Sequence, residues 1–116
     1  MKFSEYRSMD ATTMLEGIRD KQFTAEELLE AAQTRLDQVN PRLNAVILDL
    51  TAAASDQIAA GLPDGELSGI PFVVKNMDGI LAGEPCSMGS RALAGWVPEY
   101  DSSLFARYRD AGVVFL

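Results

Sequence analysis

The sequence predicts an α/β domain, because segments with helical spacing of apolar residues alternate with short continuous apolar runs. These runs lie at 45–48, 70–74 and 113–116. Apolar runs without polar alternation are typical of strands that helices cover on both faces. The length of 116 residues and the hydrophobic content of 47% suit one domain. We therefore expect a sheet flanked by helices.

Three helices are predicted in the first half of the chain. Asp10 can cap a short helix that runs to about Asp20. A capping box predicts the start of the second helix, with Thr24 as N-cap and Glu27 at the third helical position. Apolar residues then recur at helical spacing: Leu28, Leu29, Ala32, Leu36 and Val39. We expect this helix to end at Asn40-Pro41, since the residue before a proline disfavours helical backbone. An alanine-rich helix should follow over about 51–60, and Gly61 is placed to end it.

Strands and a long loop are predicted around and after that helix. Residues 45–48 are predicted to form a short buried strand, and 70–74 a second one with Pro71 at its start or at an edge. Glycines and prolines dominate 76–99, which predicts a mostly ordered loop. Asp101 or Ser102 should cap a last helix that Gly112 ends. Its apolar residues are Leu104, Phe105, Tyr108 and Ala111, and a strand over 113–116 follows.

Composition excludes several classes of function. The net charge of −7 and the scattered basic residues argue against a nucleic-acid or anionic-membrane surface. No apolar run approaches the ~18 residues that span a bilayer, and the start has no apolar core of a signal peptide. We expect a cytoplasmic protein. The absence of histidine removes Ser-His-Asp and Cys-His mechanisms from within this chain, and most zinc and iron sites with them. We therefore expect no metal and no cofactor.

Lys75 is the candidate catalytic residue. It closes the apolar run Gly69-Ile70-Pro71-Phe72-Val73-Val74 and is the only lysine after Lys21. A lysine delivered by a buried strand can act as a general base, because an apolar surrounding favours the neutral amine. Taken alone, such a lysine is more often a surface residue whose amine stays in water. Cys86 and its neighbouring serines are interpreted as loop residues, since no imidazole is present to activate them.

Several segments, taken in order, resemble the amidase-signature hydrolases. Asn40-Pro41-Arg42-Leu43-Asn44-Ala45 resembles the turn after the first long helix of that family. Leu67-Ser68-Gly69-Ile70-Pro71-Phe72-Val73-Val74-Lys75 resembles the segment that delivers the family's catalytic lysine. The segments 82–85 with 89–93, and then 101–114, resemble the loop, helix and strand that follow. The resemblance covers about Thr24 to Leu116.

The resemblance implies the N-terminal part of the amidase-signature fold, a mixed sheet flanked by helices, and a Ser–cis-Ser–Lys mechanism. By matching position, Lys75 would be the base that takes a proton through a bridging serine. A second serine would then attack the amide carbonyl, and backbone N–H groups of a glycine-rich turn would hold the oxyanion. One departure is Asn76, where family members usually have aspartate.

Both serines of that mechanism belong to a segment beyond Leu116, so residues 1–116 are expected to form a single, incomplete N-terminal segment of an amidase domain. We expect this segment to be inactive alone, and the complete enzyme to act on a small-molecule amide. Whether this chain is an enzyme is left open. It could instead be a non-catalytic interaction module, or one chain of a split amidase. In a split amidase, a second chain would dock on the apolar strand Val113-Val114-Phe115-Leu116.

Overall fold

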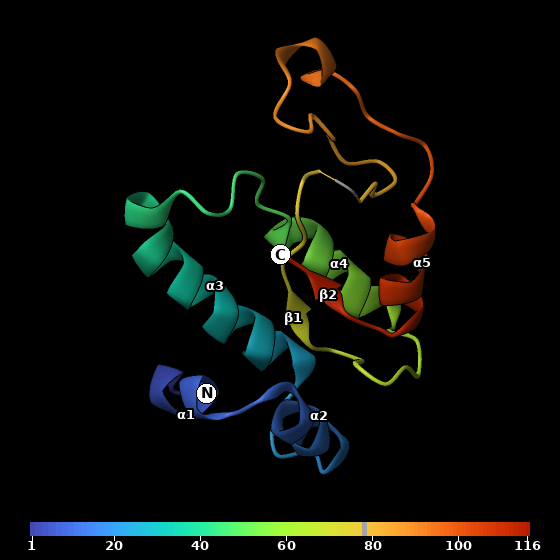
Figure 1. Cartoon of the computed structure of the whole chain (residues 1–116). Coiled ribbons are helices and arrows are strands. Elements are labelled where there is room, and N and C mark those ends of the chain that lie inside the picture. The colour runs from blue at the N-terminus through green and yellow to red at the C-terminus, as the bar shows by residue number, and fades with distance from the viewer. Residues whose placement is uncertain (78) are drawn as a thin grey trace. The chain divides into compact units, whose positions relative to one another are not determined.

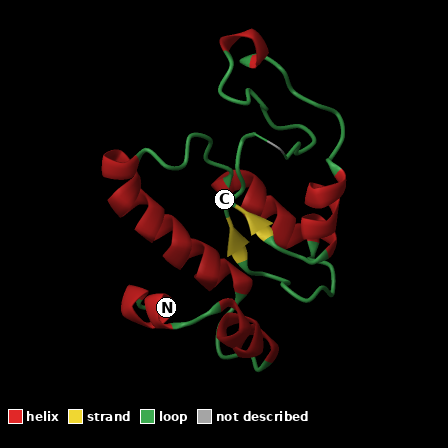
Figure 2. Ribbon diagram, in the orientation of Figure 1, coloured by secondary structure: helices red, strands yellow, loops and turns green. Residues whose placement is uncertain are grey.

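The computed structural model describes residues 1–77 and 79–116 (Figures 1 and 2). Two compact units divide the chain. The N-terminal unit comprises Met1–Val73 with Ala111–Leu116, and the loop unit comprises Val74–Asp110. In chain order the elements are α1 (Phe3–Ser8), α2 (Ala11–Arg19), α3 (Ala25–Leu43), α4 (Thr51–Ala60), β1 (Pro71–Phe72), the 3₁₀ helix η1 (Arg91–Leu93), α5 (Ser103–Asp110) and β2 (Val114–Phe115).

A parallel pair of strands, β1 and β2, lies at the centre of the N-terminal unit and confirms the α/β class. Pro71 pairs with Val114, and Phe72 with Phe115. The N–H of Val114 donates to the carbonyl of Ile70 at 2.9 Å, and Pro71 leads the strand as expected. Helix α3 contacts β1, and α4 contacts both β2 and α3. The sheet is therefore covered by the two longest helices of the unit.

Helices α2 and α3 begin where the capping residues predicted. Asp10 accepts a hydrogen bond from the N–H of Thr13 at 2.8 Å at the start of α2. Thr24 and Glu27 form both bonds of the capping box at the start of α3. Inward-facing residues of α3 are buried: Ala25, Leu28, Leu29, Ala31 and Ala32. These side chains supply one wall of the core.

The predicted end of this helix at Asn40-Pro41 is wrong, because α3 continues to Leu43 with Pro41 inside it. A proline in the last turn removes only one helical hydrogen bond, so the helix tolerates it there. The helix ends instead at Asn44, which adopts the left-handed conformation with φ of 48°. The N–H of Asn44 donates to the carbonyl of Asn40 at 2.7 Å.

The predicted strand at 45–48 is also wrong, since these residues are irregular and Ile47 is 68% exposed. The side chain of Asn40 explains the difference. Its Oδ1 accepts from the N–H groups of Ala45 and Val46 at 2.9 and 3.0 Å, and its Nδ2 donates to the carbonyl of Val46 at 2.8 Å. Backbone groups that a strand would have used for pairing are therefore occupied by one side chain.

The apolar C-terminal residues are buried within the N-terminal unit. Val113 and Val114 are 0% exposed, Phe115 4% and Leu116 8%. Val114 and Leu116 pack with Leu29 of α3 and Ala54 of α4. Gly112 precedes them with φ of 85°, and a Cβ there would lie 2.7 Å from the Cα of Ser68, so the turn requires glycine.

The loop unit is ordered largely by its own backbone. Hydrogen bonds join 80–86 to 96–102, which we call the stem: Ser102 N–H to Ile80 carbonyl at 2.8 Å, Gly83 N–H to Pro98 carbonyl at 2.8 Å, and Cys86 N–H to Trp96 carbonyl at 3.0 Å. The residues between, 87–95, form the tip and include η1. Helix α5 follows and buries Phe105, whereas Leu104, another of its apolar residues, is 48% exposed.

Within the described residues, no helix has the length and apolar character needed to cross a membrane.

Candidate functional site

Lys75 lies in the loop unit, three residues after β1 ends at Phe72. The strand is shorter than predicted, so the lysine is not delivered directly by a strand end. Its side chain is exposed, and the nearby Val73 is 56% exposed. The apolar surrounding that was expected to favour a neutral amine is therefore not formed around Lys75 by the described residues. Among the described residues, no hydrogen bond or ion pair of the Lys75 amine is found. The amine is therefore accessible to a reacting group, and its role as a base stays a prediction.

Asn76, directly after Lys75, is held by two hydrogen bonds to the tip. Its Nδ2 donates to Ser87 Oγ at 3.0 Å, and its Oδ1 accepts from the N–H of Met88 at 3.4 Å. The side chain is half-buried. Sequence reasoning noted Asn76 only as a departure from the usual aspartate and missed these contacts. No local pattern links residues separated by a loop of this length, so only the fold could show them.

Asp101 joins the N-terminal end of α5 to the stem. Its carboxylate accepts from the N–H of Ala82 at 2.8 Å and from Arg109 Nε at 2.8 Å. The Arg109 guanidinium, chiefly through its hydrogen bond, holds the pKa of Asp101 below its usual value. Ser102 rather than Asp101 caps the helix, because Ser102 Oγ accepts from the N–H of Phe105 at 3.4 Å. These contacts fix the stem on which the tip is carried.

Cys86 is buried at the head of the stem, where its Sγ lies 3.7 Å from the carbonyl oxygen of Gly79. Gly79 in turn has no room for a side chain, since a Cβ there would lie 1.9 Å from the ring of Phe105. These contacts agree with the interpretation of Cys86 as a packed loop residue. Within residues 1–77 and 79–116, no three Cys, Asp or Glu side chains gather as a metal site would require.

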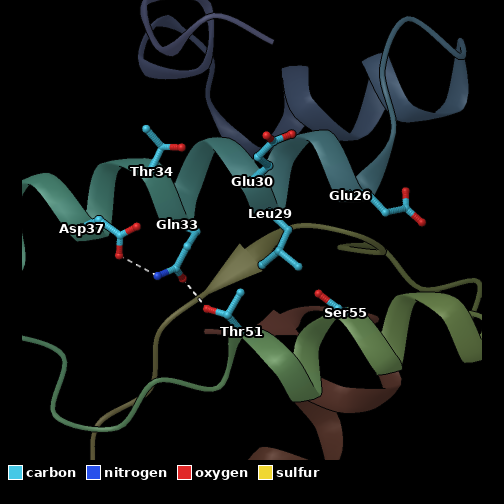
Figure 3. Close-up of a pocket in the computed structure, with 8 residues that line it drawn as sticks. All are labelled: Glu26, Leu29, Glu30, Gln33, Thr34, Asp37, Thr51 and Ser55. Atoms are coloured by element: carbon cyan, nitrogen blue, oxygen red, sulfur yellow. Dashed lines mark hydrogen bonds between the residues drawn. The ribbon is translucent and has the colours of Figure 1, made fainter.

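A pocket of about 280 Å³ lies in the N-terminal unit between α3 and α4 (Figure 3). Gln33 accepts a hydrogen bond from Thr51 Oγ1 and donates to Asp37 Oδ1 at 2.8 Å, so its amide joins the two helices. Thr51 also bonds Asp49 and, with Gln33, lowers the pKa of that carboxyl. The pocket is lined by Glu26, Leu29, Glu30, Gln33, Thr34, Asp37, Thr51 and Ser55. Lys75 is not among them.

Comparison with known protein families matches residues 27–116 to the amidases. The chain therefore belongs to the amidase-signature family, whose members hydrolyse the carbon–nitrogen bond of amides.

Among curated relatives, the chain is 34% identical over 120 residues to the A subunit of the glutamyl-tRNA(Gln) amidotransferase from Salinispora arenicola. That alignment covers 97% of this chain and 24% of the relative. Among solved structures, 6-aminohexanoate cyclic dimer hydrolase superposes with a TM-score of 0.85 at 29% identity, covering 93% of this chain and 22% of that one. Peptide amidase from Stenotrophomonas maltophilia gives 0.76 at 31% identity, covering 99% and 25%. The chain thus spans about a quarter of the length of the proteins it matches.

Proposed function

We propose that this chain supplies the base-bearing part of an amide hydrolase, with Lys75 as the general base. The observation that carries the proposal is the position of Lys75. It ends the segment that contains β1, inside the range matched to the amidases, and its amine is exposed. A base must reach the proton it removes. The Lys75 amine is exposed and has no partner among residues 1–77 and 79–116, so it can do so.

In the proposed reaction, the neutral Lys75 amine takes a proton from a bridging serine, which takes one from the nucleophilic serine. The nucleophilic serine attacks the amide carbonyl and forms an acyl-enzyme, and the amine of the substrate leaves with the proton that Lys75 returns through the bridging serine. Water then hydrolyses the acyl-enzyme and releases the acid. Both serines are proposed to come from polypeptide outside residues 1–116. They could lie in the same gene product or in a second chain that docks near Val113–Leu116. The substrate class that fits the family is a small or cyclic amide.

The test compares residues 1–116 alone with the complete enzyme, using chromogenic aryl amides. The complete enzyme is either the full gene product or residues 1–116 together with the second chain. We expect turnover only from the complete enzyme. Lys75→Gln should lower kcat by roughly 10²- to 10⁴-fold, the usual contribution of a general base. Lys21→Gln removes a charge from another exposed lysine and should leave kcat unchanged. Equal activity of the two variants would exclude Lys75 as the base, and turnover by residues 1–116 alone would exclude an external source of serines.

The alternative of a non-catalytic interaction module predicts a different outcome. Neither the complete gene product nor its mixture with a second chain would then hydrolyse amides, although the protein would remain folded.

A further inference from the structure

The side chain of Asn76 has one possible orientation in this structure. The N–H of Met88 can face only an oxygen, so Oδ1 of Asn76 lies toward Met88 and Nδ2 lies toward Ser87. The oxygen of Ser87 is therefore the acceptor of that bond, and its own proton is not used by Asn76. The amide bridges the residue after Lys75 to two consecutive residues of the tip.

The tip residues that Asn76 contacts form a tight turn. The N–H of Ser90 donates to the carbonyl of Ser87 at 2.8 Å, and both central residues have positive φ, 50° for Met88 and 71° for Gly89. A left-handed conformation is sterically costly for a residue with a side chain such as Met88. Such strain persists only where surrounding contacts enforce it. The bond from Met88 to Asn76 is one such contact.

We propose that Asn76 is a positioning residue that fixes the backbone from which Lys75 projects; this rests on the proposed function of Lys75. Lys75 lies in no helix or strand, and no bond of its own side chain holds it among the described residues. Asn76 shares a peptide bond with it and is tied to the tip, which the Cys86–Trp96 pair of the stem holds in place. The two hydrogen bonds of Asn76 therefore also restrain the backbone of Lys75.

The neutral amide matters as well as the bonds. An aspartate at this position could accept from the Met88 N–H and from the Ser87 hydroxyl, so it would keep both contacts. It would also add a negative charge one residue from the amine, and that charge favours the protonated form, which cannot act as a base. Asn76 thus supplies the geometry without the charge.

Three substitutions in the complete gene product test the proposal. Asn76→Ala removes both bonds and should lower kcat by roughly 10- to 100-fold with little change in KM, since small misplacements of a catalytic group have effects of that size. Asn76→Asp should restore most of kcat at high pH, while the acidic limb of the kcat/KM profile moves to higher pH. Ser87→Ala should lower kcat less, and adding it to Asn76→Ala should have no further effect.

The control is Gln38→Ala, which truncates an exposed amide on α3 and should leave kcat and the pH profile unchanged. Thermal unfolding shows whether each variant is folded; if Asn76→Ala is not, the kcat of Ser87→Ala and the kcat of Asn76→Asp at high pH decide. Wild-type kcat in Asn76→Ala overturns the positioning role, and so does a kcat of Asn76→Asp that stays low at high pH. An unmoved acidic limb in Asn76→Asp overturns the role given to the neutral amide. If Lys75→Gln is inactive and Asn76→Ala keeps wild-type activity, only this inference is overturned. If Lys75→Gln is fully active, the proposed function is overturned, and this inference with it.

Discussion

Replacing Asn40 by alanine should destabilise the protein through the turn that follows α3. The substitution removes three hydrogen bonds, to the N–H groups of Ala45 and Val46 and to the Val46 carbonyl. At about 0.5–1.5 kcal/mol each, the bonds contribute roughly 1.5–4.5 kcal/mol in total. Water can replace part of this, because the turn is largely exposed. Alanine also gains about 0.5 kcal/mol of helix propensity over asparagine. We therefore expect a net loss of about 1–3 kcal/mol.

Urea unfolding followed by circular dichroism measures this loss. With a slope of about 2 kcal/mol per molar urea, the midpoint should fall by roughly 0.5–1.5 M. Gln38→Ala is the matched control, because it truncates an exposed amide two residues earlier on the same helix. It should stay within about 0.5 kcal/mol of wild type. If the two variants unfold at the same urea concentration, the Asn40 side chain does not hold the turn and our explanation of the missing strand is wrong.

Two further predictions concern packing and charge. Leu28→Ala should cost about 2–5 kcal/mol, because Leu28 is 0% exposed; Leu43→Ala on the same helix, 66% exposed, should cost less than about 0.5 kcal/mol in the same urea experiment. The lowered pKa of Asp101 means that its bond to Arg109 stabilises the fold above the ordinary carboxyl pKa of about 3.9, and this contribution is lost as the pH falls through the lowered value. Unfolding measured against pH should therefore show a stability gap between wild type and Asp101→Asn near neutral pH that closes in acid; a constant gap would contradict this assignment.

Local sequence signals predicted a helix start correctly where the residues that give the signal also form the cap in the structure. Thr24 and Glu27 begin α3 because their side chains satisfy N–H groups at the helix start, which requires nothing distant. Pro71 begins β1 for a similarly local reason. The start of α1 at Phe3 was not predicted, since its six residues have no buried side chain that would mark a pattern.

The errors arose where one side chain competes with a general tendency. Ala45 to Leu48 has the composition of a strand, yet Asn40 takes its backbone groups, and composition does not record that competition. The candidate site divides in the same way. Lys75 could be selected from its motif, whereas the contact of Asn76 with Ser87 depends on how the stem brings the tip back to residue 76. Its geometry could be known only once the loop was folded.

The stem also determines where this loop can change length. Its backbone pairs close the loop at Cys86 and Trp96, so residues inserted between η1 and Trp96 would enlarge a loop that is already closed. Doubling the length of a closed loop costs only about 0.6 kcal/mol. Loss of one residue from 80–86 would instead displace every following pair of the stem. Among related proteins, we expect insertions to lie after η1. The tip can then vary in length while the residues that hold Asn76 keep their spacing.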